Sequence, residues 1–353
     1  MAGLKMITSS EEDSKTTASY SSISKTDAAE RIAVMQDQET TSYKSHDYIA
    51  CDTTPSPSSC SGPHQEQHRG RVDRECREKM CQWCYQVTDF CKFRREAVAI
   101  SMSYLDRFLS SSSPRAQKAL YSKKEYQLAS MTCLYLAVKL FEPMVIDASL
   151  LAAISQGCYA EKDIIDMEED ILHALKWRMN GPIVHDFISH IMVFLPKSAY
   201  SHAQHDVTTI LSDFSRYQAE ISVCDYDLSL MNNGDIALAA LLNSIEGIDE
   251  KVFPARSRFE FFLCISDETG LNPFSYDVNV ARSRLLKLFR KNSGYELPQV
   301  ANLTPVVDCS KTKKKKEFTI PTMKMKRLNS TGSTSPVSVT HQFERRDSRA
   351  KCA

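Results

Sequence analysis

Glycine is scarce in this chain, with 10 glycines among 353 residues. Glycine-rich loops let a backbone approach a phosphate closely, so this scarcity leaves little room for such sites. The phosphate-binding patterns GxxxxGK and GxGxxG do not occur, and neither do the hydrolase patterns GxSxG and HExxH. These absences argue against the common nucleotide-binding and hydrolytic enzymes. We expect a protein that is not an enzyme and needs no cofactor.

Long apolar runs and net charge are lacking as well. The opening MAGLKMITSSEED has no apolar run of the kind found in signal peptides, and no stretch is long enough to cross a bilayer. The 44 Lys and Arg balance the 44 Asp and Glu, so no overall field favours nucleic acid or an acidic membrane. We therefore expect an intracellular protein without membrane contact, whose 12 cysteines are reduced thiols.

Both ends of the chain differ in composition from the middle. Residues 1–70 are rich in Ser and Thr, with Leu4 as their one leucine and neither Phe nor Trp. Such a segment cannot bury enough apolar surface to fold, so we predict that it is disordered. Residues 295–353 are predicted to be a disordered basic tail, which from Lys311 onward has twelve Lys or Arg against three Asp or Glu. Its run KTKKKKEF is as typical of a solvated tail as of a nuclear-import signal.

The two ends also contain candidate phosphorylation sites. Four of these residues precede a proline and the fifth lies in the basic context RRDS: Thr54, Ser56, Thr304, Ser335 and Ser348. A phosphate there would add negative charge to unstructured chain. The composition of residues 1–70 is also compatible with turnover controlled by phosphorylation.

The middle of the chain is predicted to be all-α, because apolar residues recur at spacings of three and four and no run alternates with period two. In residues 71–181 we expect helices over REKMCQWCYQVTDFCKF, REAVAISMSYLDRFL, SMTCLYLAVKLFEP, ASLLAAIS and EKDIIDMEEDILHALKW. Residues 182–294 repeat the pattern, and their apolar helix NNGDIALAALLNSIEG follows the first apolar helix by about 110 residues. Two tandem five-helix bundles fit these spacings.

Lys139 is the only charge between Met131 and Phe141, in the apolar third helix. Burying an unpaired ammonium is costly, so this side chain must reach water or meet a partner. A lysine near a helix C-terminus also complements the helix dipole and can extend its charged end into solvent. The stretch alone leaves both interpretations open.

Four motifs resemble the cyclin box in order and spacing: YLDRFLSS, LASMTCLYLAVKLFE, MEEDILHALKW and VHDFI. Their residues are most similar to those of D-type (G1) and related cyclins. The resemblance runs from about Cys76 to about residue 190, and the second bundle fits the family by pattern only. It implies the cyclin fold and a non-catalytic subunit that binds and activates a cyclin-dependent kinase, in the nucleus, at G1 or G1/S. The Leu-x-Cys-x-Glu motif that D-type cyclins often carry for pocket proteins does not occur.

The resemblance also implies roles for two charged pairs. Lys139 in AVKLFE and Glu168 in MEEDIL match the residues with which cyclins bind the regulatory helix region of the kinase. An ammonium can donate to kinase backbone carbonyls, and a carboxylate can accept from backbone amides. Arg77 and Asp106 match a pair that bridges the first two helices, and their implied role is structural.

A third implied feature is a shallow substrate-docking patch for Arg-x-Leu motifs. Its positions in this chain are Cys76, Lys79, Met80, Trp83 and Gln127. Lys79 places a charge where the family has an aliphatic residue, so we expect weakened docking of basic motifs. Met80 and Trp83 fit the interior of a bundle equally well.

The cysteines suggest a different kind of site, because Cys81 and Cys84 have the spacing of half a zinc site. The neighbouring Cys76 and Cys91 fall in the same predicted helix and do not complete a tetrahedron. Core packing is therefore the default interpretation, and no metal is expected.

Two alternatives to a kinase regulator remain within the same fold: a transcription factor of the TFIIB type and a scaffold without kinase activation. TFIIB-type proteins join an N-terminal zinc ribbon to basic DNA-binding faces. Here the N-terminal segment offers only Cys51 and Cys60, and the folded part is not strongly basic. Nucleic acid is therefore not an expected partner.

Overall fold

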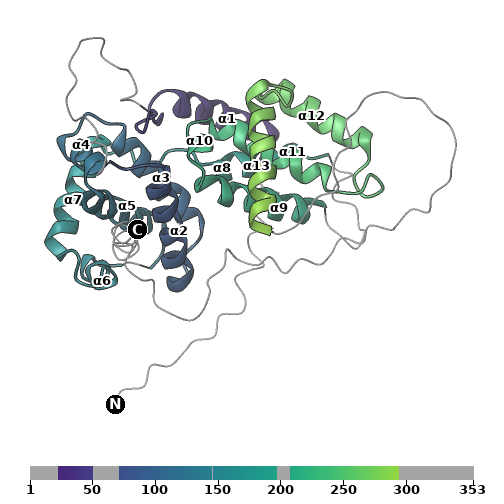
Figure 1. Cartoon of the computed structure of the whole chain (residues 1–353). Helices are drawn as coiled ribbons and strands as arrows, with labels where there is room; N and C mark the ends of the chain where they lie inside the picture. Colours follow the sequence, from purple (N-terminus) through teal and green to yellow (C-terminus); the bar gives the residue numbers. More distant parts are fainter. Residues whose placement is uncertain (1–22, 51–70, 145, 197–206, 294–353) are drawn as a thin grey trace, which may run out of the picture.

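The computed structural model describes residues 23–50, 71–144, 146–196 and 207–293, and every regular element in these ranges is helical. Figure 1 shows two groups of helices, the blue-to-teal α2–α7 and the green α8–α13, with the purple α1 beside the second group. The predicted all-helical fold is confirmed. In the described ranges, no helix combines the length and the apolar character needed to span a membrane.

The first bundle surrounds α5 (Lys123–Phe141), in which every residue from Tyr126 to Val138 is buried. This helix is apolar on all sides because neighbouring helices cover all of its faces. It ends just before Pro143, as the sequence predicts. The surrounding helices are α2 (Arg74–Cys91), α3 (Glu96–Leu109), α4 (Pro114–Tyr121), α6 (Ala148–Ile154) and α7 (Glu161–Ala174).

Helix α4 is one helix more than the sequence pattern predicts for this bundle. Its first residue is Pro114, whose missing amide hydrogen is tolerated at that position. Within eight residues it buries only Ala116, Ala119 and Leu120 against its neighbours. A helix this short, with small apolar residues, produces too few periodic positions to be recognised from its pattern.

The local predictions for the other helices of this bundle agree with the structure in most details. Asp147 caps α6, because its Oδ1 accepts from the Leu150 amide at 2.8 Å. The predicted inner faces of α3 and α7 are buried. Phe90 is an exception among the apolar residues of α2, because it lies in the last turn and is 66% exposed.

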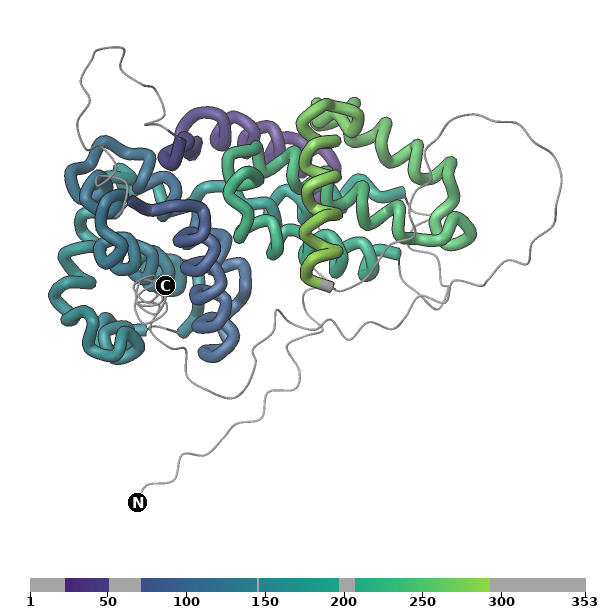
Figure 2. Tube along the Cα trace, in the orientation of Figure 1, coloured from purple at the N-terminus to yellow at the C-terminus, as the bar shows by residue number. Residues whose placement is uncertain are grey.

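The second bundle repeats this arrangement around α11 (Asn233–Glu246), which is buried from Ile236 to Ile245. Its other elements are α8 (Val184–Ile191), η2 (Met192–Phe194), α9 (Val207–Val223), α10 (Tyr226–Ser229), α12 (Ala255–Thr269) and α13 (Tyr276–Ser293). Helices α8, α9 and α13 pack directly on α11. Figure 2 shows the path of the chain from one bundle into the other.

Helix α1 (Lys25–Thr40) corrects the prediction that residues 1–70 are disordered. Its side chains Ala28, Ile32 and Met35 follow one face and are buried against α8 and α12 of the second bundle. Ser24 caps its first turn by accepting from the Asp27 amide. The average composition of seventy residues obscured this one short amphipathic stretch.

The packing of α1 predicts how its two aliphatic side chains respond to truncation. Ile32 is fully buried, whereas Val34 is 56% exposed on the same helix. We expect Ile32→Ala to lower the free energy of unfolding by about 2 to 5 kcal/mol, because it leaves a cavity. Val34→Ala, the matched control, should change it by less than about 0.5 kcal/mol. Denaturant unfolding of both variants measures this, and equal small effects would show that α1 does not pack here.

Candidate functional site

Lys139 and Glu168 lie together on the surface of the first bundle. Lys139 is in the last turn of α5 and Glu168 is on α7, and Lys139 Nζ donates to Glu168 Oε1 at 2.9 Å. The side chain of Lys139 is 44% exposed and that of Glu168 is 13% exposed. The hydrogen bond to Glu168 raises the pKa of the Lys139 ammonium above its ordinary value. Lys139 therefore both reaches solvent and has a partner within its own chain.

Exposed apolar side chains lie on α5, on α7 and on the segment and helix α6 between them. Leu140 and Met144 follow Lys139 in the chain and are 50% and 58% exposed. Ile165 lies one turn before Glu168 on α7, and Leu150 lies on the adjacent α6. Charged groups among exposed apolar side chains are typical of a surface that binds another protein. We call these six residues the α5–α7 surface.

Arg77 and Asp106 form a second pair, in the interior rather than on the surface. Arg77 Nε and Nη2 donate to Asp106 Oδ1 and Oδ2 at 2.9 and 2.7 Å, a two-pronged contact between α2 and α3. The side chains are 1% and 7% exposed. Burial alone would lower the pKa of the Arg77 guanidinium, but the Asp106 carboxylate outweighs burial and raises it. The pair predicted from the sequence is therefore present and buried.

The Arg77–Asp106 pair also holds two segments that the sequence did not connect to it. Arg77 Nη1 donates to the Val223 carbonyl at the end of α9, at 2.7 Å. The buried Tyr48 hydroxyl donates to Asp106 Oδ1 at 2.9 Å. Tyr48 belongs to the segment predicted to be disordered, so that prediction is wrong for residues 41–50 as well. Nothing in the local sequence around Tyr48 indicates a partner 58 residues away.

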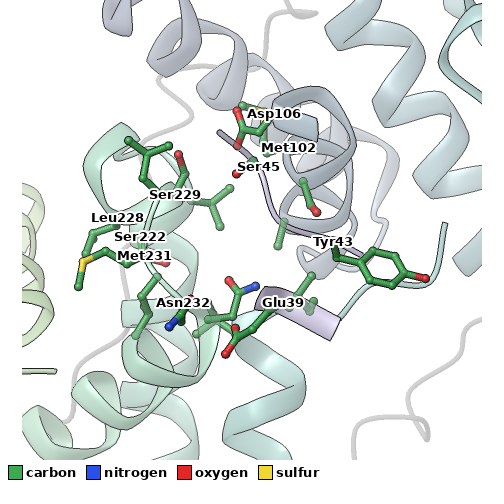
Figure 3. A pocket seen from close by; sticks show the side chains of 18 of the residues that line it. Glu39, Tyr43, Ser45, Met102, Asp106, Ser222, Leu228, Ser229, Met231 and Asn232 are labelled. Atoms are coloured by element: carbon green, nitrogen blue, oxygen red, sulfur yellow. The ribbon is translucent and has the colours of Figure 1, made fainter. Parts of the chain in front are cut away.

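A pocket of about 100 Å³ lies between the two bundles, beside this pair. In Figure 3, side chains from α1, from the segment after it and from both bundles point into it, among them Glu39, Ser45, Asp106 and Asn232. Glu39 Oε2 accepts from the Gly234 amide in the first turn of α11, at 3.2 Å. Burial nevertheless raises the pKa of Glu39 to about 7, and the nearby Asp235 adds to the rise. No sequence pattern singles out Glu39.

The positions of the expected substrate-docking patch are in the core. Cys76, Met80, Trp83 and Gln127 are at most 3% exposed, between α2 and α5. Lys79 lies toward the outside, with its Nζ 3.1 Å from Glu75 Oε1 on the same helix. The structure therefore agrees with the interior interpretation of Met80 and Trp83 and shows no open patch at these four side chains.

The described cysteines of α2 are mostly interior residues. Cys76, Cys81 and Cys84 are buried, and burial raises the pKa of the Cys84 thiol to about 12. Within the described ranges, no group of three or more His, Cys, Asp or Glu side chains is arranged to hold a metal ion. The candidate phosphorylation sites lie outside those ranges: Thr54, Ser56, Thr304, Ser335 and Ser348.

Comparison with known proteins identifies the first bundle. Residues 30–180 match the family model of the cyclin N-terminal domain. The chain is 26% identical over 175 residues to G1/S-specific cyclin-D1 of Xenopus laevis, covering 49% of this chain and 55% of that protein. It is 30% identical over 145 residues to G1/S-specific cyclin-D2 of Gallus gallus, covering 39% of this chain and 47% of that protein. The chain thus matches about half the length of these curated relatives.

Among solved structures, a viral cyclin from herpesvirus saimiri is similar to 62% of this chain and 88% of its own, with a TM-score of 0.48 and 20% sequence identity. The helical bundle and the family match together define the class of protein: the chain carries a cyclin N-terminal domain. Among the curated relatives, the matches to cyclin-D1 and cyclin-D2 make this box similar to that of D-type cyclins. The resemblance seen in the sequence is confirmed.

The burial of the Arg77–Asp106 pair predicts a large effect of removing one partner. We expect Arg77→Ala to lower the free energy of unfolding by about 3 to 5 kcal/mol, because Asp106 is left buried and uncompensated. Arg94 is the matched control, since its side chain is 64% exposed and pairs with Glu142. Arg94→Ala should cost no more than about 1 kcal/mol. Urea unfolding of the two variants tests this, and similar losses would contradict it.

The raised pKa of Glu39 predicts a pH dependence with a definite sign. Because the folded chain binds the proton more tightly than the unfolded chain, stability is highest below the ordinary pKa of 4.5 and falls as pH rises toward about 7. Between pH 5 and pH 8 this group should lower the free energy of unfolding by roughly 2 to 3 kcal/mol.

Glu39→Gln keeps an acceptor for Gly234 and removes the titration, so the loss of stability between pH 5 and pH 8 should shrink by that amount. Unfolding curves at the two pH values measure the difference. Glu30→Gln, at an exposed position of the same helix, controls for the exchange of a carboxylate for an amide. An undiminished loss in Glu39→Gln would show that this carboxyl is not the group responsible.

Proposed function

We propose that this chain is a non-catalytic regulatory subunit that binds and activates a cyclin-dependent kinase. The observation that carries this function is the Lys139–Glu168 pair, placed among exposed apolar side chains on a cyclin N-terminal domain. The curated relatives are named as G1/S-specific cyclins, which supports the same role here. More specifically, we propose that the chain regulates cell-cycle progression at G1 or G1/S.

The chemistry of the pair suits a backbone ligand. In the free chain the Lys139 ammonium donates to Glu168 and also interacts with Tyr135, and its remaining donor capacity can serve carbonyl oxygens of a partner. The carboxylate likewise keeps lone pairs for backbone amides. Leu140 and Ile165 would be covered by the bound kinase and would exclude water from these bonds, which strengthens them.

Binding at the α5–α7 surface would act on the kinase through its αC helix. A kinase is active when the ion pair between its β3 lysine and its αC glutamate is formed. A subunit that binds the inward position of αC better than the outward one shifts the kinase toward that state. The subunit needs a rigid surface to do this, and α5 provides one because it is buried along nearly its whole length.

The proposal also covers the location of the chain in the cell and the docking of kinase substrates. The basic tail, with its KTKKKKEF run, supports a nuclear location, and the distribution of a chain lacking residues 311–353 would test it. Substrates are expected to dock weakly on α2, since Met80 and Trp83 are buried and Lys79 adds a charge. Comparing phosphorylation of substrates with and without an Arg-x-Leu motif would reveal any stronger docking.

The proposed kinase contact predicts the outcome of a double substitution. Lys139→Ala combined with Glu168→Ala should weaken binding to cyclin-dependent kinases by at least about 30-fold, because charged groups desolvated in an interface are lost. Calorimetry with a panel of purified kinases measures this, and phosphorylation of a histone-type substrate reports activation. The melting temperature should stay close to that of the unchanged protein, since the pair is partly exposed.

The matched control is Arg256→Ala with Glu260→Ala, an exposed ion pair on α12 whose loss should leave kinase binding unchanged. Unchanged affinity in the folded Lys139/Glu168 variant would reject the assigned contact. If the unchanged protein binds none of the kinases, the regulator proposal fails. DNA binding in a gel-shift assay would then favour the transcription-factor alternative, and its absence the scaffold.

A further inference from the structure

Two cysteines from different bundles meet where the bundles join. Cys81 lies in α2, and Cys224 directly follows α9; they are 143 residues apart in the chain. The Cys224 thiol lies 3.0 Å from Cys81 Sγ, sulfur to sulfur. A disulfide has a sulfur–sulfur distance of about 2.05 Å, so a shift of roughly 1 Å would bring the two atoms to bonding distance.

The two thiols differ in their access to solvent. Cys81 is buried, and burial raises the pKa of its thiol well above the ordinary value. Cys224 is partly exposed and lines a second cavity, of about 210 Å³. The charged side chains around that cavity are Arg74, Glu78, Asp225, Arg284 and Lys291. A small oxidant can therefore reach Cys224 directly, whereas Cys81 is shielded from solvent.

We propose that Cys81 and Cys224 form a reversible disulfide when the protein meets hydrogen peroxide. The Cys224 sulfur attacks one peroxide oxygen and the O–O bond breaks, which gives a sulfenic acid on Cys224 and one water. The Cys81 sulfur then attacks the Cys224 sulfur. The S–O bond breaks, and the leaving hydroxide takes the Cys81 proton as a second water. Two thiols are oxidised by two electrons and one peroxide is reduced, so the reaction balances.

The bond would link the two bundles covalently beside their existing contact. Cys81 lies one helical turn after Arg77, and Cys224 directly follows Val223, whose carbonyl accepts from Arg77. The disulfide would close a loop that contains all of α3, α5 and α7. A cross-link of this length stabilises the folded chain by restricting the unfolded one. This modification does not depend on the proposed kinase contact.

The test uses the full-length chain treated with a small excess of hydrogen peroxide. Free thiols are then blocked with N-ethylmaleimide, and the digest is analysed by mass spectrometry without reduction. We expect a peptide pair joined through Cys81 and Cys224 that dithiothreitol separates. The melting temperature of the oxidised chain should rise by roughly 5 to 15 °C and return on reduction.

Substitutions separate the two steps. With Cys81→Ser, or Cys81→Ala where serine destabilises the core, the sulfenic acid on Cys224 should persist and react with dimedone. With Cys224→Ser, the linked pair should vanish and Cys81 should stay reduced. Cys91→Ser, on the same helix as Cys81, is the matched control and should leave the yield of the linked pair unchanged.

Three results would overturn the proposal. Cys224 could react to a stable sulfenic or sulfinic acid although Cys81 is present. It could join other cysteines as readily as Cys81, or remain a thiol at peroxide concentrations that oxidise Cys91.

Discussion

The buried Arg77–Asp106 pair is the contact on which the arrangement of the chain depends. Two charges away from water are stable only when each hydrogen-bonding group has a partner. Four segments provide those partners: α2, α3, the Val223 carbonyl of the second bundle and the Tyr48 hydroxyl. Because any displacement of one segment would leave a buried charge without a partner, the pair fixes their relative positions more strictly than apolar packing alone would.

The position of the α5–α7 surface follows from the packing of the helices around the Arg77–Asp106 pair. Helix α3 packs on α5, and α5 is covered until its last turn, where Lys139 reaches solvent. Helix α7 crosses the same end of α5 and brings Glu168 within 2.9 Å. Lys139 is therefore held at the solvent-exposed end of a helix that is otherwise packed on all sides. A surface that must hold a partner's helix in one position benefits from this rigidity, because little conformational entropy remains to be lost on binding.

Most of the fold could be predicted from the sequence, since residues three or four apart define the inner faces of α3 and α7 and an unbroken apolar run defines the central helix α5. The errors concern contacts that local patterns do not contain. Tyr48 reaches Asp106 across 58 residues, and Glu39 reaches Gly234 across 195. The sequence left open whether Trp83 lies in a docking patch or in the interior, because a local pattern does not tell whether another helix covers that side chain. The Lys139–Glu168 pair was predicted only through the family resemblance, because the two residues lie on different helices.

Residues 223–226 are one part of the junction between the bundles, beside the contacts of Arg216 with Glu96 and of Glu220 with Tyr85 and Arg95. Three of these residues contact side chains outside the second bundle, in α2 or in the segment after α1: Val223 contacts Arg77, Cys224 contacts Cys81 and Tyr226 contacts Asp47. A chemical change there acts on how the second bundle is held against the first. The α5–α7 surface lies wholly within the first bundle and keeps its geometry. Oxidation at the junction should therefore affect partners that contact both bundles more than a partner that contacts only this surface.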